Sequence, residues 1–328
     1  MNKKIIFSGT RPTGPLHLGN YLGGIKGYLE LQENPNFDCI YSVVDLHGIT
    51  SPYNPKNYQD QVWELVLEYL ACGLNPEKAH LTIQSHIPQH LELSYYFSTI
   101  YPVSRLAQLP TYKDKKKEQP KYINLGLLYY PVLMAADILI YKGELVPVGK
   151  DQLPHLEVTR EISRIFNQKF GQTFPEPQAY LTKGAYVPSL TGYGKMSKTE
   201  PKSYISLIDD LDTIKNKLFK VPTDIGKGKT LPKEGGVYTL LTLVELFEGL
   251  EKRKEYEKQY LKTGIKYHSL KIELAKAIYQ VLKPIQEKRE YFKAKLKLVK
   301  EILLEGEKYA QKIAQKTLEE VKEKMGIL

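Results

Sequence analysis

Two short segments, far apart in the sequence, carry side chains suited to phosphate chemistry. The first, "SGTRPTGPLHLGNYLGG" (8–24), follows a predicted strand and opens a predicted helix. His17 and Asn20 are three residues apart, so both can face one ligand and donate hydrogen bonds to a phosphate oxygen in a transition state. Arg11 adds a fixed positive charge. The alternative is an ordinary strand–turn–helix in which His17 only caps the helix.

The second segment is "GYGKMSKTEP" (192–201), in which Lys195 and Lys198 lie three residues apart after two glycines. A lysine ammonium is a point charge on a flexible stem and can follow phosphate groups as their charge shifts. We therefore predict a movable clamp for a polyphosphate, with Gly192 and Gly194 as candidate hinges. Taken alone, the same segment would also fit a solvated loop.

A third candidate is Asp137 in the apolar window "LGLLYYPVLMAADILIY" (125–141). Tyr130, Met134 and Asp137 fall on one face of a helix. A carboxylate among apolar neighbours is costly to bury without a partner, and a ligand N–H or O–H in an aromatic pocket would be one. The alternative is a structural salt bridge or a hydrogen bond between helices.

A fourth candidate is "VGKDQLPH" (148–155), again at a predicted strand-to-helix junction. Gly149 permits close approach of a ligand, Asp151 could hold a pair of ribose hydroxyls, and Gln152 could hold an amide, amine or carboxylate. Both polar residues could instead cap the helix. His47, in "VVDLHGIT", is a similar candidate, although a lone histidine is more often structural.

Strand and helix signals alternate over the first 200 residues. Strands are predicted at 4–9, 39–45, 79–84 and 144–149, and helices at 21–32, 62–70 and 152–166. This alternation predicts a Rossmann-like, doubly wound parallel sheet that binds ligands at the carboxyl ends of its strands. Charged or Gly/Pro-rich loops are predicted at 112–122 and 222–236, and helices at 238–258, 267–283 and 290–325. We expect a catalytic domain over 1–204, a helical region over 205–300, and a C-terminal helix over 301–328 that packs back on the body.

Net charge, cysteine content and the apolar window indicate the kind of partner and the cellular environment of the protein. The 328 residues carry a net charge of +10, of which +8 comes from residues 251–328, so a polyanion could dock there. The two cysteines, Cys39 and Cys72, have apolar neighbours and no CxxC partner, which favours reduced thiols. The window 125–141 is short and contains Pro131 and Asp137, so we do not expect it to span a membrane. We expect a cytoplasmic protein.

Several of these motifs together resemble a known family. "PLHLGN" (15–20) resembles the HIGH signature of class I aminoacyl-tRNA synthetases, and "KMSKT" (195–199) resembles their KMSKS signature. Between them, "LMAADILIY" (133–141) and "VPVGKDQLPHLEVTRE" (146–161) are similar to bacterial tryptophanyl-tRNA synthetases. The resemblance extends to "KPIQEKREYF" (283–292) and is densest over 1–210.

The resemblance implies a set of site residues. The catalytic residues would be His17, Asn20, Lys195 and Lys198. The ATP contacts would be Arg11, Pro12, Thr13, Gly19, Asn20, Lys115, Gly149, Lys150, Asp151, Val187, Lys195, Met196, Ser197, Lys198 and Thr199. The tryptophan pocket would be Phe7, His47, Tyr130, Met134, Asp137 and Gln152, with Asp137 accepting the indole N–H. Departures from the family pattern occur at Arg11, Leu46, Lys150 and Thr199.

The implied reaction is the activation of L-tryptophan by Mg·ATP, followed by transfer of the tryptophanyl group to tRNA(Trp). The magnesium would come with ATP and not be held by the protein, and two distant cysteines cannot supply the Cys₄ ligation of an iron–sulfur cluster. The resemblance also implies a homodimer. The alternatives are a tyrosyl-tRNA synthetase, a small-molecule adenylyltransferase, or a tRNA-binding relative without activity.

Overall fold

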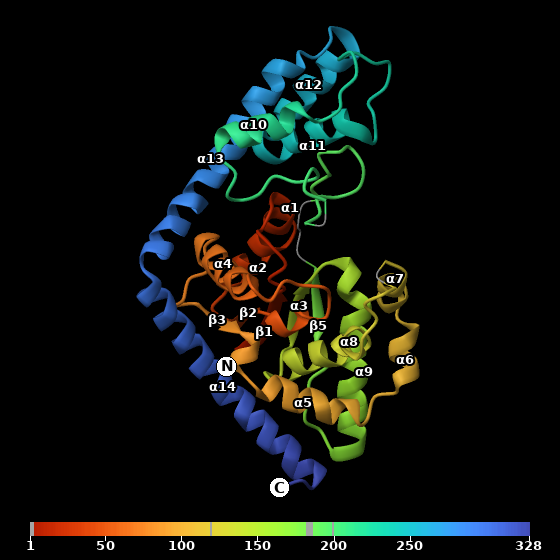
Figure 1. Ribbon diagram of the computed structural model, residues 1–328, viewed down its shortest axis with the longest axis vertical. Coiled ribbons are helices and arrows are strands. Elements are labelled where there is room, and N and C mark those ends of the chain that lie inside the picture. Colours follow the sequence, from red (N-terminus) through yellow and green to blue (C-terminus); the bar gives the residue numbers. More distant parts are fainter. Residues whose placement is uncertain (1–2, 119, 182–185, 199) are drawn as a thin grey trace.

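The computed structural model describes residues 3–118, 120–181, 186–198 and 200–328. Within them, one parallel sheet has the strand order β3–β2–β1–β4–β5 (Figure 1). The strands are β1 (Lys4–Thr10), β2 (Phe37–Val43), β3 (Ala79–Ile83), β4 (Leu145–Val148) and β5 (Gln178–Leu181). The chain builds the sheet outward from β1 to β3 and then returns to place β4 on the other side of β1. This change of direction makes the carboxyl ends of β1 and β4 a topological switch point, and sheets of this kind bind their ligands beyond the strand ends there.

Helices cover both faces of the sheet because successive strand residues point to opposite sides. Ile6, Cys39 and Tyr41 belong to one hydrophobic cluster, while Phe7 and Ile40 belong to another. The first cluster continues through the segment around Met196 into the helical region, and the second lies under helices of the body. The predicted doubly wound α/β fold is confirmed.

The helices of the amino-terminal half include two short ones at the edge of the sheet and several longer ones. They are α1 (Leu18–Asn20), a π-helix (Tyr21–Ile25), α2 (Lys26–Leu31), α3 (Asp45–Gly48), α4 (Tyr58–Ala71), α5 (Gln89–Ser98), α6 (Val103–Gln108), α7 (Pro110–Glu118), α8 (Leu125–Leu139) and α9 (Leu153–Phe170). Short 3-10 turns cover Gln84–His86 and Lys150–Gln152.

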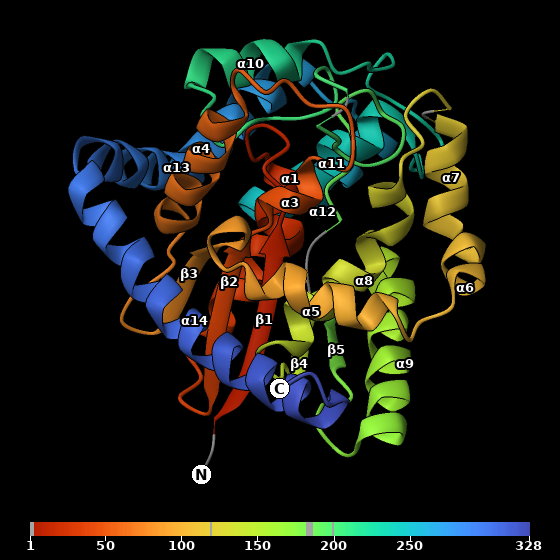
Figure 2. The same cartoon turned by 60° about the horizontal axis from the view of Figure 1, so that its bottom comes forward.

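The helices of the carboxyl-terminal part are α10 (Leu211–Phe219), α11 (Gly235–Glu248), α12 (Leu250–Lys262), α13 (Tyr267–Ala294) and α14 (Leu296–Met325). Figures 1 and 2 show α10–α12 and the start of α13 as a separate layer beyond the carboxyl ends of the strands, while α14 returns along the body. α14 packs closely on the edge strand β3, since a Cβ on Gly306 would lie 2.3 Å from the carbonyl oxygen of Leu81. The edge of the sheet is therefore covered.

Several predicted elements are wrong in their details. Residues 110–118 form helix α7 and not a charged loop, because Lys and Glu favour helices and Lys115 pairs with Glu118 at 2.5 Å. The single helix predicted over 238–258 is two helices that meet at Gly249, whose φ is 94°. Helix α13 continues through Pro284 to Ala294, beyond its predicted end at 283.

The last helix, α14, buries one face, with Val299 and Val321 fully buried and Tyr309 and Ile313 partly buried. Cys39 is buried, Cys72 is half-buried, and both are free thiols. Across the described ranges, no helix combines the length and the apolar character needed to cross a bilayer.

Candidate active site

The predicted ligand-binding segments converge at the carboxyl edge of the sheet. Residues 11–20 follow β1, His47 follows β2, and Gly149–Gln152 follows β4. Figure 1 shows α1 lying between the sheet and the helical region. The segment 186–198, distant in sequence, lies against the same edge through direct contacts described below.

The turn before α1 fixes His17 and Asn20 relative to each other. The N–H of Asn20 donates to His17 Nδ1 at 3.3 Å, and Asn20 Oδ1 accepts from the His17 N–H at 3.2 Å. This reciprocal pair is a capping box, so the capping role considered for His17 is confirmed. Since Nδ1 is the acceptor, a neutral His17 carries its proton on Nε2 and presents it as a donor.

Two other elements hold the same turn in place. His17 pairs with Ser206 in an isolated antiparallel bridge, and the Leu18 N–H donates to the Ile205 carbonyl at 3.0 Å. On the opposite side, the Leu16 N–H donates to both carboxylate oxygens of Glu68 in α4, at 3.0 and 3.2 Å. The turn is therefore anchored by the body and by the segment that leads into the helical region.

The two-lysine segment lies directly against this turn. Lys198 Nζ donates to the Gly14 carbonyl at 2.8 Å, and a Cβ on Gly19 would lie 3.2 Å from the Cβ of Met196. Met196 is buried, and its N–H donates to the Val187 carbonyl at 3.2 Å. The side chain of Lys195 is exposed. The structure thus brings His17, Asn20 and Lys198 together, and Lys195 lies immediately before the buried Met196.

Burial and mutual repulsion shift the titration of this cluster. Burial, reinforced by the charge of Lys198, lowers the pKa of His17 to about 4. His17 is therefore a neutral donor at pH 7. Burial also lowers the pKa of Lys198 to about 8, with Glu68 opposing the shift and Arg11 adding to it. Lys198 thus stays mostly charged at neutral pH although its site favours the uncharged form.

Asp137 lies at the centre of a buried hydrogen-bond network. His47 Nε2 and His90 Nδ1 each lie 2.7 Å from one of its carboxylate oxygens, and Gln84 Nε2 donates to it at 2.8 Å. Burial opposes its ionisation, but the charge and hydrogen bond of His47 and the bond of His90 outweigh burial and hold the pKa of Asp137 below its usual range. His90 Nε2 lies 2.7 Å from the Tyr141 hydroxyl.

The apolar environment predicted for Asp137 is therefore wrong. Three polar side chains from other elements surround it, so the considered alternative of a structural partner is present. Within the described residues, Oδ1 accepts from both Gln84 and His90, whereas Oδ2 accepts from His47 alone. A carboxylate oxygen can accept two hydrogen bonds, so Oδ2 retains capacity for a ligand donor.

The remaining residues predicted for the tryptophan pocket surround this network. The Tyr130 hydroxyl lies 2.9 Å from His155 Nε2, and its ring meets His47 edge-on at 6.3 Å between centroids. Phe7 stacks on Tyr141 at 5.5 Å. Met134 is half-buried on the same helix as Asp137. Phe7 and Tyr130 therefore contact members of the network around Asp137, and Met134 lies one turn before Asp137 on α8.

Gln152 occupies the N-cap position of α9, but its side chain makes no capping hydrogen bond there. Its amide donates to Asp151 Oδ2 at 3.0 Å. A Cβ on Gly149 would lie 2.7 Å from Asp151 Oδ1, so the carboxylate of Asp151 lies close to the backbone of Gly149. Asp151 is exposed and so is accessible to a ligand.

The other residues predicted to contact ATP are less closely tied to the His17 turn. Arg11 and Thr13 are exposed after β1, and Pro12 between them is buried. Lys115 lies on α7 and pairs with Glu118, so its ammonium is engaged on its own helix. The Ser197 N–H donates to Ser203 Oγ at 3.0 Å. Thr199 and the side chain of Lys150 lie outside what the structure describes.

Sequence reasoning missed several site residues, namely Glu68, Gln84, His90, Tyr141 and His155. Gln84 comes immediately after β3, so the rule that ligand residues follow strand ends could have found it. Glu68 lies on the buried face of α4, where a carboxylate is unusual and therefore informative. His90, Tyr141 and His155 are single aromatic residues in helical or turn context and gave no signal.

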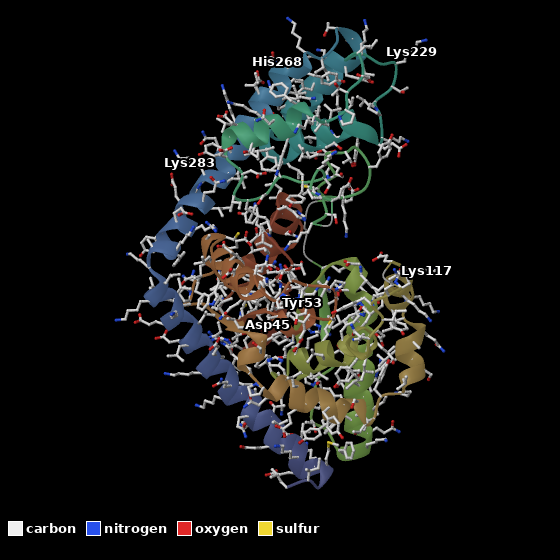
Figure 3. The ribbon with its side chains drawn as sticks, viewed as in Figure 1. Asp45, Tyr53, Lys117, Lys229, His268 and Lys283 are labelled. Atoms are coloured by element: carbon white, nitrogen blue, oxygen red, sulfur yellow. The ribbon has the colours of Figure 1, made fainter. Side chains whose placement is uncertain are left out.

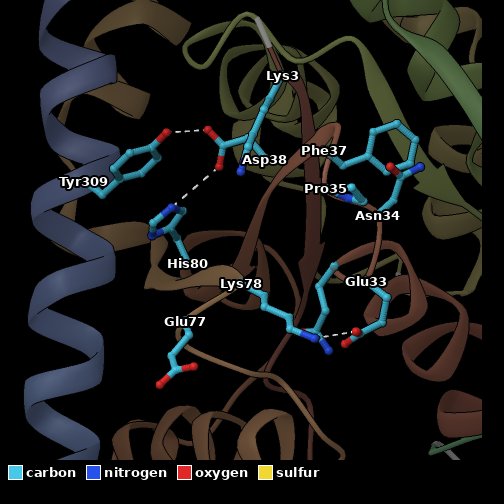
Figure 4. Close-up of a pocket in the computed structure, with 11 residues that line it drawn as sticks. Lys3, Glu33, Asn34, Pro35, Phe37, Asp38, Glu77, Lys78, His80 and Tyr309 are labelled. Carbon is cyan, nitrogen blue, oxygen red and sulfur yellow. Dashed lines mark hydrogen bonds and ion pairs between the residues drawn. The ribbon is translucent and has the colours of Figure 1, made fainter. Parts of the chain in front are cut away.

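A cavity of about 560 Å³ lies elsewhere, at the amino ends of β1–β3 (Figure 4). Asp38 there accepts a hydrogen bond from the Tyr309 hydroxyl, and the Tyr309 ring stacks on His80 at 3.7 Å. None of the residues predicted for the site lines this cavity. The carboxyl edge is therefore the candidate active site.

Comparisons with known proteins show the family of the chain. A family model described as tRNA synthetases class I (W and Y) matches residues 1–283. The tryptophan–tRNA ligases of Caldanaerobacter subterraneus subsp. tengcongensis and Wolinella succinogenes are 40% and 38% identical. The alignments cover 99% of both chains for the first and 100% of both for the second.

Solved structures agree over the whole chain. The tryptophanyl-tRNA synthetase of Campylobacter jejuni complexed with ADP and tryptophan superposes with a TM-score of 0.86, at 30% identity over 98% of this chain and 99% of that one. The enzyme of Mycoplasma pneumoniae gives a TM-score of 0.83 at 31% identity, over 99% of this chain and 98% of that one.

Proposed function

We propose a mechanism from the premise that this chain belongs to the tryptophanyl-tRNA synthetases, within class I of the aminoacyl-tRNA synthetases. Its function is that of a tryptophan–tRNA ligase, which sets aside the tyrosyl and adenylyltransferase alternatives. The observation that carries the mechanism is the contact between the His17 turn and the Lys198 segment, because it assembles phosphate-binding groups from both ends of the catalytic region.

In this proposal, the triphosphate of Mg·ATP binds between the two segments. His17 Nε2–H, the Asn20 amide and the ammonium groups of Lys195 and Lys198 surround the phosphates. Arg11 adds charge from the end of β1. The magnesium arrives with the nucleotide, and among the described residues no group of three His, Cys, Asp or Glu side chains is placed to hold a metal ion.

The nucleoside end would lie along the strand ends next to the phosphates. Asp151 accepts hydrogen bonds from the ribose hydroxyls, and Gly149 allows the sugar to approach the backbone. Val187 and Met196 supply an apolar surface near the base. The bound ADP of the Campylobacter jejuni enzyme supports a nucleotide site in this fold.

Tryptophan would bind beside Asp137, with its indole N–H donating to Oδ2. The three existing donors keep the carboxylate ionised and oriented, so the acceptor is in place before the substrate arrives. Phe7, Tyr130 and Met134 contact the indole ring, while Gln152 and His47 lie at the polar end. The tryptophan bound in the Campylobacter jejuni enzyme supports a tryptophan site in this fold.

The first chemical step is an in-line displacement. A carboxylate oxygen of tryptophan attacks the α-phosphorus, the bond from that phosphorus to the α,β-bridging oxygen breaks, and pyrophosphate leaves. A terminal ribose hydroxyl of tRNA(Trp) then attacks the acyl carbon of the adenylate, releasing AMP. No covalent bond to the protein is needed, so the side chains act by positioning and by stabilising charge.

The helical region, roughly 205–300, would hold the anticodon end of the tRNA. Figure 3 shows Lys229 and Lys283 pointing away from the body on this region, with His268 near its end. Such exposed cations suit a phosphate backbone. We assign residues 1–204 to ATP and tryptophan, and 301–328 to the support of the sheet edge.

A homodimer in the cytoplasm completes the proposal. Large apolar side chains are exposed on α5, α6 and the start of α8, helices that contact one another. They include Leu91, Tyr95, Val103 and Leu125, exposed by 47, 66, 64 and 76% respectively. A second copy of the chain could cover them.

The test is an exchange assay on Asp137→Ala. Loss of the acceptor should cost about 2–4 kcal/mol of transition-state stabilisation, because a buried N–H would be left unpaired. Tryptophan-dependent exchange between ATP and pyrophosphate should slow accordingly. Asp137→Asn, which preserves the side-chain shape, controls for collapse of the network. If exchange with tryptophan is unchanged in both variants, the pocket assignment is wrong. Tyrosine provides the matched substrate control, since the wild type should not activate it.

A further inference from the structure

Glu68 is a buried carboxylate that the mechanism above does not use. It lies on α4 and is only 3% exposed. Both of its oxygens accept the same hydrogen bond, from the N–H of Leu16, at 3.0 and 3.2 Å. Leu16 immediately precedes His17, so this carboxylate of α4 holds the backbone of the phosphate-binding turn in place.

A single backbone N–H does not compensate for the burial of a charged carboxylate, so nearby cations matter. Lys198 and Arg289 both favour the ionised form of Glu68. Arg289 comes from α13 and makes a salt bridge with Glu64, one helical turn before Glu68. Lys198 comes from the two-lysine segment and contacts Gly14, two residues before Leu16. Glu68 therefore holds the turn directly, and its charge interacts with that of the lysine that contacts the same turn.

We propose that Glu68 is a positioning residue for adenylate formation. Its carboxylate accepts the hydrogen bond from Leu16 and so fixes the turn. Its negative charge also keeps Lys198 protonated beside Gly14 until a bound triphosphate supplies that counter-charge instead. The inference rests on the proposed ATP site. It concerns a residue that acts through Lys198 and the Leu16 backbone, and that does not itself contact the substrate.

The titration of the two groups is consistent with such a pairing. Burial raises the pKa of Glu68 to about 7, opposed by the Leu16 hydrogen bond and the charge of Lys198. Burial lowers the pKa of Lys198 to about 8, opposed by the charge of Glu68. The other charged or titratable groups that act on this pair are Arg289, Glu64, Cys72, Arg11 and His17. Without the carboxylate, Lys198 would lose its proton at a lower pH.

The experiment measures the Kd of Mg·ATP by calorimetry, without tryptophan, from pH 6.5 to 9. Glu68→Gln retains the shape and an oxygen that can accept from Leu16, but it removes the charge. We expect the alkaline loss of ATP affinity to move down by about one pH unit, the size of effect that a neighbouring charge has on a pKa. At pH 8 the affinity should fall about 3- to 10-fold, with the Kd for tryptophan unchanged.

Glu64→Gln is the matched control, because it removes a carboxylate from the same helix one turn away. Its pH profile should follow the wild type or move slightly upward, because the charge of Glu64 opposes the ionisation of Glu68. If Glu68→Gln has the wild-type profile, or if Glu64→Gln shifts equally, the inference is overturned. Glu68→Leu, which also removes the acceptor, should lower kcat for pyrophosphate exchange further than Glu68→Gln does. Thermal unfolding of each variant verifies that the comparison is between folded proteins.

The same protein samples separate this inference from the proposed function. A wild type that binds ATP but exchanges no pyrophosphate in the presence of tryptophan refutes the proposed function. The calorimetric profiles still decide the role of Glu68 in that case. A wild type that exchanges normally, with unchanged ATP profiles in Glu68→Gln, refutes the role of Glu68 alone.

Discussion

Lys198 Nζ lies 2.8 Å from the carbonyl oxygen of Gly14, a residue 184 positions earlier in the chain. This hydrogen bond joins the segment after β1 to the segment that precedes the helical region. It also places an ammonium group at a carbonyl that a phosphate oxygen can replace as its partner. Binding of a triphosphate would therefore exchange a protein acceptor for a charged one, which is the stronger hydrogen bond.

Replacing Lys198 by Ala should slow adenylate formation far more than it weakens tryptophan binding. The ammonium stabilises charge that grows on the phosphates during the reaction, and losing one such donor typically costs about 10²- to 10³-fold in kcat. We expect Lys195→Ala to behave in the same way. Single-turnover kinetics would give the rate of adenylate formation, and calorimetry the Kd for tryptophan.

Lys202→Ala is the control for these variants, since Lys202 is an exposed lysine just beyond the segment. It should leave both quantities within about twofold of the wild type, as a surface substitution normally does. Equal losses of adenylate formation and tryptophan binding in Lys195→Ala or Lys198→Ala would show that the segment only maintains the fold.

Gly19→Ala should separate the two phosphate-binding segments. A Cβ at this position would lie 2.9 Å from His17 Cε1 and 3.2 Å from the Met196 Cβ, so the ring or the segment must move. Misplacing catalytic groups by a fraction of an ångström should reduce kcat/KM for ATP by about 10-fold or more. Steady-state pyrophosphate exchange measures this, and an unchanged value in a folded variant would mean that the contact is not needed.

The sequence predicted the strands well because their signal is local. The predicted strand at 79–84 agrees with β3 to within one residue, since "AHLTIQ" is a short apolar and β-branched run between polar ends. β5 (Gln178–Leu181) was missed because its residues are largely exposed and form no apolar run. Helix α13 continues through Pro284, although proline normally ends a helix, because buried Leu282 and Ile285 pack on either side of it.

The candidate site was predictable where its residues follow strands or lie in a distinctive local pattern, such as the two lysines after Gly192 and Gly194. His17, His47 and Asp151 follow strands, and the structure places them along one edge. Glu68 and His90 depend on tertiary contacts with partners 52 and 47 residues away, which no local pattern encodes. The environment of Asp137 was misjudged for the same reason, since its polar partners all come from other elements.

Acidification should destabilise the protein between about pH 6.5 and pH 4. Burial lowers the pKa of both His17 and His155 from 6.5 to about 4. Between pH 6.5 and 4 the two histidines therefore bind more protons in the unfolded chain than in the folded chain. Their contribution to the free energy of unfolding is complete above pH 6.5 and is lost as the pH falls toward 4. Each histidine can contribute a slope of up to about 1.4 kcal/mol per pH unit.

Urea unfolding at several pH values would measure this slope in the wild type and in His155→Gln. The variant should lose stability less steeply over the same window, whatever its absolute stability. His86→Gln is the control with the opposite sign, because the hydrogen bond from His86 to Glu307 raises the pKa of His86. A slope that does not change in His155→Gln would contradict the assignment.

Binding of tRNA(Trp) should weaken steeply with salt if the helical region contacts the phosphate backbone. Lys276, Lys283 and Lys288 are exposed lysines spaced along α13. Each lysine that neutralises a phosphate releases about one counterion, so replacing it by Gln should reduce the slope of log K against log salt by about one. Filter binding or fluorescence anisotropy over a range of salt concentrations would measure this slope for the triple variant.

An equal change of charge on α14 provides the matched control. Lys300, Lys308 and Lys312 are exposed there, on the helix that covers β3. Replacing these three by Gln lowers the net charge by the same amount, so any effect of overall charge on tRNA binding is equal in the two variants. Only the α13 variant should lose part of the salt slope, while both should retain tryptophan-dependent pyrophosphate exchange, since that step needs no tRNA. Equal slopes in the two triple variants would mean that α13 does not contact the tRNA backbone and that the anticodon end docks elsewhere.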